Sequence, residues 1–380
     1  MSTKIVKWLV AIIVMVLIAV GLWSWQSSKI SSAPVGDKSP IKVGVIIPLT
    51  GNFASIGIKI RNGLELAKQD WENKNPGQRI ELIYEDQGNC LPSDTVLATQ
   101  KLINIDKVKL IGAQFCVPGL VPSLAITEPN KIVTAGIAAN VQEILGSKYY
   151  FSPSFSVRDN SINIADFAVK NLKAKRGAFL YYNTQLGINY RKYTAERFEE
   201  LGGQVVADEM TPLSQMDFRT ELAKIKASKP DVIFVTQITG ALGNVLKEAK
   251  EMNIEVKMIG NNSNEDSVML GVAGKAAEGF IISSADPAAI GENPSGFLDR
   301  FKAKFNVDAD YFSSNAYDAL SLEIPAYVKC NGDTDCLMTE LHKVADYSGA
   351  SGKITINKEG IASKPVLFKV VKEGKFVPLP

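Results

Sequence analysis

The feature that most constrains the fold is a repeated alternation between short apolar runs and longer amphipathic stretches from residue 41 onward. Residues 41–48 form a continuous apolar run, as expected of a strand that is buried on both faces. Residues 57–73 carry apolar side chains at helical spacing, and a Pro-Gly stop signal follows them. Because strands that alternate with helices favour parallel pairing, the sequence predicts an α/β fold with two doubly wound parallel sheets.

The same alternation runs through most of the chain. Further strands are predicted at residues 79–85, 109–112, 131–135, 176–182, 204–209, 231–236, 256–260 and 279–283. Further helices are predicted at residues 92–106, 189–201, 217–228 and 241–252. The last part differs, with helices at residues 294–305, 313–327 and 334–346 and strands at 353–357, 366–371 and 375–377. This part is too short for a third domain, so we expect it to complete the first two.

The N-terminus carries the signal for the cellular compartment. Lys4 and Lys7 precede an uncharged apolar run at residues 8–25, which has about the length of a membrane-spanning helix. Positive charge before the run predicts a cytoplasmic segment at residues 1–7 and an extracytoplasmic bulk. Residues 26–40 are rich in Ser, Pro and Gly and predict a flexible tether.

The apolar run can be a retained anchor or a cleaved signal peptide. The small residues that end at Ala33 are the best cleavage site, but they match the pattern weakly. No cysteine precedes Cys90, so the run cannot end in a lipid-modified cysteine. We expect an anchor in the cell membrane, with a periplasmic or secreted protein as the alternative if the segment is cleaved.

Composition argues against several classes of function. The net charge of +2 lacks the clustered basic excess of a nucleic-acid-binding protein. The single histidine, His342, argues against Ser–His or Cys–His catalysis and against a His-rich metal site. Glu85 and Asp86 could serve as an acid–base pair, but bracing of a loop is the commoner role at a strand end. We therefore expect no enzyme, no cofactor, no metal site and no nucleic-acid partner.

Four cysteines in an exported chain predict disulfides. Four cysteines allow three pairings. Cys330 and Cys336 flank a turn-rich loop, which favours a local bridge and leaves Cys90 with Cys116. Four free thiols remain an alternative, while the spacing does not match the paired CxxC motifs of a zinc site.

Ligands of open parallel sheets bind beyond the carboxyl ends of the strands, so the loops there are the candidate site. The first loop, residues 48–57, is rich in Gly and small polar residues at the start of a helix, and it matches neither a Walker A loop nor a dinucleotide fingerprint. The other strand-end loops are residues 86–90, 114–119, 136–140, 183–187, 237–240 and 261–266.

Several motifs in a fixed order resemble a known family. They are IKVGVIIPLTGNFASIG at residues 41–57, NGLELA at 62–67, Glu85-Asp86 leading to Cys90, LIG at 110–112 leading to Cys116, AAEGF at 276–280, AYDA at 316–319 and YSGASGK at 347–353. Together they resemble the leucine/isoleucine/valine-binding branch of the type I periplasmic binding proteins. The resemblance covers the chain from residue 41 to the C-terminus.

The resemblance implies two lobes joined by a three-strand hinge. Lobe one would comprise residues 41–152 and 285–363, and lobe two residues 153–284 and 364–380. Ligand would bind in the cleft, and the closed form would dock on an ABC permease, or the protein would be the ectodomain of a ligand-sensing receptor that acts through a signalling partner. The family also has a disulfide that matches Cys90–Cys116.

The resemblance implies a ligand site, but this sequence lacks most of the side chains with which the family binds an amino acid. The positions of the family's carboxylate-binding Ser and Thr are Val117 and Ala138, and its acidic partner of the ammonium matches Asn262. Its aromatic residues match the apolar positions Ile56, Leu186 and Ile238. The complete set of expected ligand-binding residues is Asn52, Ile56, Gln114, Val117, Gly136, Ile137, Ala138, Leu186, Ile238, Thr239 and Asn262.

These replacements bear on the ligand. An unpaired ammonium in a closed cleft would cost several kcal/mol. Among the amino acids, amides and small organic acids that such a protein captures, the sequence therefore favours a hydrophobic amide or organic acid. Backbone groups together with Gln114, Gln237 or Thr239 could still hold an amino acid in part.

Overall fold

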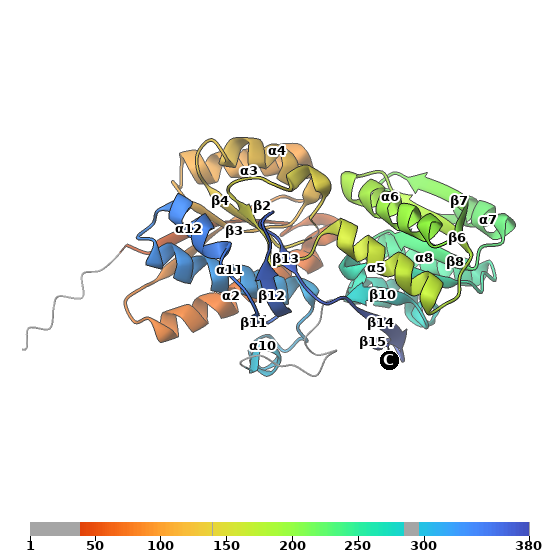
Figure 1. The fold of residues 1–380 in the computed structure, drawn as a ribbon. Coiled ribbons are helices and arrows are strands. Elements are labelled where there is room, and N and C mark those ends of the chain that lie inside the picture. Colours follow the sequence, from red (N-terminus) through yellow and green to blue (C-terminus); the bar gives the residue numbers. More distant parts are fainter. Residues whose placement is uncertain (1–38, 139, 285–295, 380) are drawn as a thin grey trace, which may run out of the picture.

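The computed structural model describes residues 39–138, 140–284 and 296–379 (Figure 1). The predicted cytoplasmic segment at residues 1–7, the membrane segment at 8–25 and most of the tether at 26–40 lie outside these residues. The predicted start of the second part of lobe one at residue 285, and the first residues of the helix at 294–305, lie outside them as well. Within the described residues, no helix combines the length and the apolar character needed to cross a membrane.

The first sheet is parallel throughout, with strand order β2-β1-β3-β4-β5. Its strands are β1 (Ile41–Ile47), β2 (Ile80–Asp86), β3 (Leu110–Gln114), β4 (Val133–Gly136) and β5 (Tyr150–Phe151). In β1, Val43, Val45 and Ile47 pack into one core and Ile46 into another, so side chains on both faces are buried. This two-sided burial explains the continuous apolar run of the sequence.

The second sheet has seven strands in the order β15-β14-β10-β9-β8-β6-β7. They are β6 (Arg176–Tyr182), β7 (Gln204–Thr211), β8 (Val232–Thr236), β9 (Lys257–Gly260), β10 (Ile281–Ser284), β14 (Leu367–Lys372) and β15 (Lys375–Pro378). Strands β6 to β10 are parallel, while β14 and β15 add an antiparallel hairpin at one edge. The C-terminal strands therefore extend an existing sheet, as predicted.

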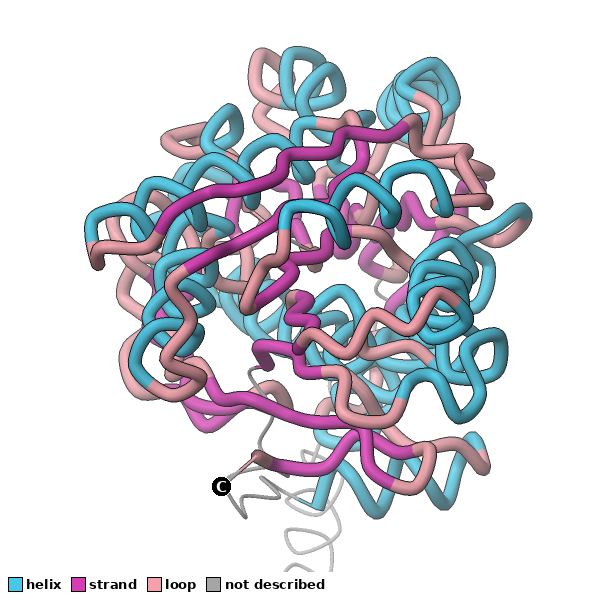
Figure 2. Tube along the Cα trace, turned by 90° about the vertical axis from the view of Figure 1, so that its right-hand side faces the viewer, coloured by secondary structure: helices cyan, strands magenta, loops and turns pink. Residues whose placement is uncertain are grey.

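Helices cover both faces of each sheet (Figures 1 and 2). Those on the first sheet are α2 (Ala54–Lys74), α3 (Pro92–Asn104), α4 (Val117–Thr127), α10 (Phe297–Phe305), α11 (Tyr311–Lys329) and α12 (Thr334–Leu341). Those on the second sheet are α5 (Val157–Lys170), α6 (Gln185–Glu200), α7 (Arg219–Ser228), α8 (Thr239–Glu251) and α9 (Ser267–Ala273). The predicted α/β fold with doubly wound, mainly parallel sheets is confirmed.

Three helices, α4, α5 and α9, were not predicted. Helix α4 has the sequence VPGLVPSLAIT, which contains two prolines and no charged residue. Because α4 is buried on much of its surface, it lacks the polar stripe that identifies an amphipathic helix. Pro118 is tolerated in its first turn, where no intrahelical N–H is needed, while Pro122 lies inside the helix.

The connections between the two sheets come from three parts of the chain. Residues 152–156 join β5 to α5, and residues 364–366 join β13 (Ala362–Ser363) to β14. The third runs from β10 towards α10 through residues that are not described. Strand β13 belongs to a small antiparallel sheet with β11 (Tyr347–Gly349) and β12 (Gly352–Ile356). The precise lobe boundaries stay a prediction.

Candidate functional site

A cavity lies between the two sheets, at the carboxyl ends of their parallel strands. It encloses about 520 Å³ of empty space, including its opening to solvent. From the first-sheet side it is lined by Phe53, Ile56, Cys90, Phe115, Cys116, Val117, Pro118, Ala138 and Phe312. From the second-sheet side it is lined by Tyr182, Thr184, Leu186, Leu213, Ile238 and Ser263. Among the described residues, those that line the cavity are therefore all uncharged.

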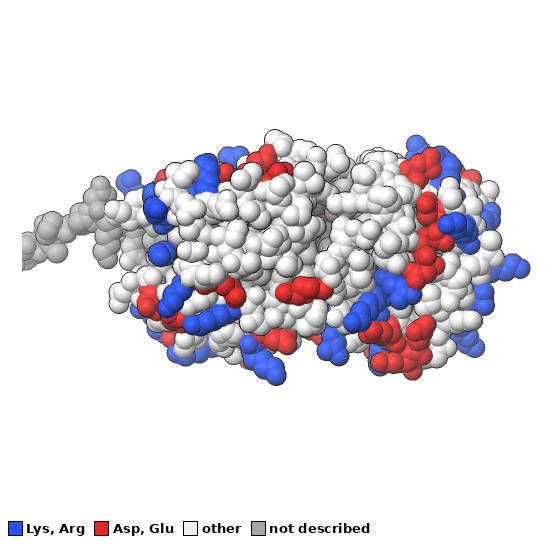
Figure 3. Space-filling model, turned by 90° about the horizontal axis from the view of Figure 1, so that it is seen from above, with Lys and Arg blue, Asp and Glu red and all other residues white. Residues whose placement is uncertain are grey.

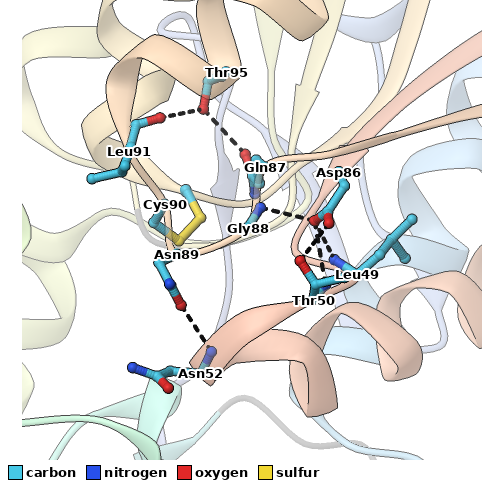
Figure 4. The surroundings of a disulfide bond; sticks show 11 residues. Leu49, Thr50, Asn52, Asp86, Gln87, Gly88, Asn89, Cys90, Leu91 and Thr95 are labelled. Atoms are coloured by element: carbon cyan, nitrogen blue, oxygen red, sulfur yellow. Dashed lines mark hydrogen bonds between the residues drawn. A yellow bond between two sulfur atoms is a disulfide. The ribbon is translucent and has the colours of Figure 1, made fainter.

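The disulfide between Cys90 and Cys116 shapes the first-sheet wall (Figure 4). It ties the loop after β2 to the N-cap of α4, with 5.4 Å between the two Cα atoms. Both disulfides expected from the sequence are present, because Cys330 and Cys336 form the second. The bridge Cys90–Cys116 thus holds a helix N-terminus at the cavity wall.

Asp86 braces the neighbouring loop (Figure 4). Its carboxylate accepts hydrogen bonds from the N–H of Leu49 at 2.8 Å, the N–H of Gly88 at 2.8 Å and the hydroxyl of Thr50 at 2.6 Å. Burial favours a higher pKa for Asp86, but these hydrogen bonds outweigh it and the pKa lies below its ordinary value. Asp86 is thus held as a charged loop brace, in line with the structural role favoured from the sequence.

The second-sheet wall begins where β6, β8 and β9 end. Tyr182 is the last residue of β6. Thr184 is the N-cap of α6, and its hydroxyl oxygen accepts a hydrogen bond from the N–H of Gly187. Ile238 is the N-cap of α8. Ser263 lies in a short 3₁₀ helix, η3 (Asn262–Asn264), that follows β9. The loops that follow the parallel strands of this sheet therefore lie together at the cavity, because the carboxyl ends of parallel strands share one edge of a sheet.

Three helices open towards the cavity without a side-chain cap. They are α2, α4 and α8, whose N-caps are Phe53, Cys116 and Ile238, and none of these side chains accepts a hydrogen bond from its helix. Helix α2 continues the 3₁₀ turn η1 (Gly51–Phe53), and the N–H of Ala54 already donates to Gly51, so of these three only α4 and α8 present free N-termini. The first N–H groups of a helix have no intrahelical partner, and the helix dipole places partial positive charge there. The cavity therefore combines apolar walls with backbone positive potential.

A network of buried hydrogen bonds links the two sheets beside the cavity. The hydroxyl of Tyr311, on α11, contacts Ser154 in the connection between the sheets, and Asn262 of η3. The side-chain oxygen of Asn262 accepts from Asn160 and from Tyr190, both at 2.7 Å. Burial raises the pKa of Tyr311 and Tyr190, so both phenols keep their protons.

An ion pair also joins the two halves of the molecule. The ammonium of Lys59, on α2, lies 2.9 Å from the carboxylate of Asp310 and 3.5 Å from that of Asp266. Asp310 caps α11 on the first-sheet side, whereas Asp266 caps α9 on the second-sheet side. Burial favours a lower pKa for Lys59, but the two carboxylates outweigh it and raise the pKa above its ordinary value.

The structure gathers five of the predicted ligand-binding residues around the cavity. They are Ile56, Val117, Ala138, Leu186 and Ile238. Two more, Asn52 and Thr239, line an adjoining pocket that shares Phe53, Leu213 and Ile238 with the cavity.

The other four predicted residues lie behind the cavity wall. Gln114 is fully buried and accepts a hydrogen bond from Ser123, and Ile137 is fully buried in the core. A Cβ at Gly136 would lie 1.8 Å from the hydroxyl of Tyr150, so this glycine makes room for a core tyrosine. Asn262 belongs to the network with Tyr311 described above.

Some lining residues were not identified from the sequence. Phe53 and Phe115 lie in the strand-end loops at residues 48–57 and 114–119, which were predicted to contain the site, although neither residue was named. Tyr182 was assigned only to a strand. Leu213 and Phe312 come from segments that carry no local signal of a ligand site, and only their packing places them there.

Comparison with known proteins identifies the family. The chain matches the periplasmic binding protein family over residues 40–375. It is 24% identical over 353 residues to Leu/Ile/Val-binding protein homolog 3 of Brucella melitensis, a match that covers 89% of this chain and 93% of that protein.

Two solved structures share the fold. A branched-chain amino acid transporter substrate-binding protein of Streptococcus pneumoniae, in complex with isoleucine, has a TM-score of 0.82 at 21% identity and covers 89% of this chain and 98% of its own. A solute-binding protein of an ABC transporter of Rhodopseudomonas palustris, in complex with 3,4-dihydroxybenzoic acid, has a TM-score of 0.79 at 27% identity and covers 90% of this chain and 96% of its own. The chain therefore belongs to the periplasmic binding protein family, whose members are solute-binding proteins and not enzymes.

Proposed function

We propose that the chain is an extracytoplasmic solute-binding protein that captures a small, mainly apolar carboxylate between two lobes and delivers it to an ABC permease. One observation carries the proposal: the cavity has no charged side chain among its described lining residues, yet two uncapped helix N-termini, those of α4 and α8, open onto it. Such a site can stabilise one negative charge on a ligand, but its described lining residues include no charged group that would stabilise a positive charge.

The carboxylate binds at the N-terminus of α4 in this proposal. In the first turn of α4, Pro118 has no N–H and the N–H of Gly119 donates to the carbonyl of Cys116 at 3.1 Å, so the N–H of Val117 is the donor left for a ligand. The disulfide to Cys90 holds this helix end in place. Charge-assisted hydrogen bonds from backbone N–H groups to a carboxylate are about twice as strong as neutral ones. Backbone groups thereby replace the hydroxyls that Val117 and Ala138 lack.

The apolar walls support a ligand with a hydrophobic body. Phe115 and Phe312 form an edge-to-face pair with 5.5 Å between their ring centroids, and Phe53 lines the same cavity. Aromatic walls of this kind favour an aromatic ring, because rings gain stacking or edge contacts beyond the burial of their area. The relative that binds 3,4-dihydroxybenzoic acid supports the same class of ligand.

A free amino acid is disfavoured by the same walls. Its ammonium would enter a cavity in which no described lining residue carries a carboxylate, and leaving a charge unpaired there costs several kcal/mol. Asp266 and Asp310, the acidic groups at the junction of the two sheets, already share Lys59. The isoleucine-binding relative therefore resembles this chain in fold, but we do not expect the two proteins to bind the same ligand.

The lobes at residues 41–152 with 285–363, and 153–284 with 364–380, would close on the ligand in this proposal. The ion pair of Lys59 with Asp266 and the contact of Tyr311 with Asn262 support such closure, since both bridge the two sheets. The N-terminal segment would hold the protein at the membrane beside its permease. A receptor ectodomain that acts through a signalling partner is the alternative, and isolation of the protein together with a permease would argue against it.

The face above α3, α4 and α6 supports docking on a membrane partner. Figure 3 shows that the middle of this face carries few charged side chains, whereas its ends and one edge are charged. Exposed apolar residues lie on helices of both sheets, at Leu97 of α3, Val121 of α4 and Ile188 of α6. A permease that contacts both lobes at once would recognise their closed arrangement.

A ligand panel tests the proposal on the purified full-length chain. Benzoate, cyclohexanecarboxylate, benzamide and leucine are compared by thermal shift and calorimetry. A ligand at about 100 times its Kd stabilises a protein by about 2.7 kcal/mol, so binding is readily visible. We expect both carboxylates to bind and benzamide and leucine not to bind.

A filled cavity provides the control. Ala138→Leu should abolish the response to benzoate, whereas Val121→Leu, on the exposed side of α4, should keep it. Binding of leucine, or equal binding of benzamide and benzoate, would contradict the proposed role of the helix N-termini.

A further inference from the structure

The polar side chains that line the cavity lie on one side only. Every lining residue from the first-sheet side has an apolar side chain or belongs to the disulfide. Three lining residues from the second-sheet side carry hydroxyls, and they are Tyr182, Thr184 and Ser263. The proposed carboxylate site at α4 is on the first-sheet side, so these hydroxyls face the opposite end of a bound ligand.

We propose that Tyr182, Thr184 and Ser263 form a hydroxyl-binding subsite that selects apolar carboxylates bearing a hydroxyl group at the end remote from the carboxylate. This inference rests on the proposed function and specifies its ligand class. The three residues are specificity determinants, whereas the helix N-terminus of α4 provides the affinity for the carboxylate.

Ser263 presents a hydroxyl that no other described residue satisfies. Ser263 is only 6% exposed and lines the cavity, and its hydroxyl makes no hydrogen bond to another described residue. Its backbone is fixed, because its N–H donates to the side chain of Asn261 at 2.8 Å within a capping box that also includes Asn264. A buried, positioned and unpaired hydroxyl gains a hydrogen bond when a ligand hydroxyl arrives.

Tyr182 and Thr184 add a second donor and acceptor pair. Tyr182 is 2% exposed, and burial raises the pKa of its phenol, so the phenol keeps its proton and can donate. Its side chain also interacts with that of Thr184. The oxygen of Thr184 accepts from the N–H of Gly187 at 3.4 Å, so Thr184 is held in place beside Tyr182 and the two hydroxyls form one polar pair at the cavity wall.

The chemistry of the subsite favours a hydroxyl over a charged group. Each of the three side chains is neutral and can both donate and accept, which matches the two roles of a ligand hydroxyl. A second carboxylate or an ammonium would meet no opposite charge among the described lining residues and would lose its hydration. The geometry therefore points to a monoanionic hydroxy acid, with the apolar body against Phe115 and Phe312.

The test compares matched acids on the full-length chain. Calorimetry gives the affinities for benzoate, 3-hydroxybenzoate and 4-hydroxybenzoate, and the readout is the ratio of the better hydroxybenzoate to benzoate. We expect a ratio of about tenfold for the native chain, the effect of one good hydrogen bond. Ser263→Ala and Tyr182→Phe should each bring this ratio close to one.

Tyr181→Phe is the matched control. Tyr181 precedes Tyr182 in β6, points to the other face of the sheet and does not line the cavity, so its loss should leave the ratio at about tenfold. Melting temperatures of all variants verify that they fold.

The two proposals fail in different ways. Equal affinity for benzoate and both hydroxybenzoates in the native chain overturns the subsite alone. The same holds if the ratio is high but unchanged in both Ser263→Ala and Tyr182→Phe. Absence of binding of all three acids overturns the proposed function, and the subsite with it.

Discussion

Neutralising Asp266 should weaken ligand binding by opening the cleft. Asp266 is the second-sheet partner of Lys59, at 3.5 Å, and its side chain is fully buried. Asp266→Asn removes the charge but keeps the side-chain oxygen that accepts from the N–H of Val268 and caps α9. The substitution therefore perturbs the contact between the sheets and leaves the local cap in place.

The expected magnitude follows from the geometry. Two unit charges 3.5 Å apart attract each other by about 5 kcal/mol at an effective dielectric constant of about 20. Desolvation of Asp266 and competition from Asp310 for the same ammonium offset most of this attraction. We expect a net preference for the closed form of about 1.4 kcal/mol, which corresponds to about tenfold in Kd.

Calorimetry with benzoate on the full-length chain measures this change. Because Asp266 is fully buried, salt screens the pair little, and the difference in affinity between the native chain and Asp266→Asn should change little with salt. Asp310→Asn is the control, because Asp310 and Lys59 both belong to the first-sheet side and their contact does not bridge the sheets. Unchanged affinity in Asp266→Asn, or an equal loss in Asp310→Asn, would refute the reasoning.

Two further predictions concern stability. Glu323 is fully buried, neither of its carboxylate oxygens has a partner among the described residues, and burial raises its pKa well above 4.5. The folded state then holds a proton that the unfolded state releases, so this group costs stability as pH rises above about 4.5. Glu323→Met should therefore stabilise the protein by about 1–3 kcal/mol at pH 7.5 and by less at pH 4.5, as measured by denaturant unfolding; a gain that does not change with pH would contradict a buried neutral carboxyl. Replacing Cys90 and Cys116 by Ala should cost about 3 kcal/mol of stability and also weaken benzoate binding, because the bridge closes a loop of 26 residues at the cavity wall. Replacing Cys330 and Cys336 should cost about 2 kcal/mol, since that loop spans 6 residues, and should leave binding unchanged; equal effects of both changes on binding would argue against a role of the first bridge in the site.

The location of the site was predictable to a large extent. Parallel strands send their carboxyl ends to one edge of a sheet, so the strand-end loops had to converge once the α/β alternation was recognised. Five predicted residues, among them Val117, Ala138 and Ile238, accordingly line the cavity. Gly136 and Ile137 do not line the cavity, because Gly136 lies against the ring of Tyr150 and Ile137, next to Ala138, is buried in the core.

The hydroxyl side of the cavity was not predictable in the same way. In the sequence, Tyr182 looks like one more residue of an apolar strand. It lines the cavity because β6 ends at this residue, beside the cleft. Phe312 and Leu213 reach the cavity from segments far away in the sequence. Their positions depend on the packing of α11 and of the loop after β7, which no local pattern encodes.

The sequence by itself determined the fold class, the two sheets and the disulfide framework, because hydrophobic periodicity, strand-end loops and cysteine spacing are local properties of the chain. It also determined that Val117, Ala138 and Ile238 offer no charge to a ligand. Tertiary structure alone decided which residues meet across the cleft, such as Lys59 with Asp266 and Tyr311 with Asn262. These contacts join residues that are distant in the chain, so they depend on how the two sheets are placed relative to each other.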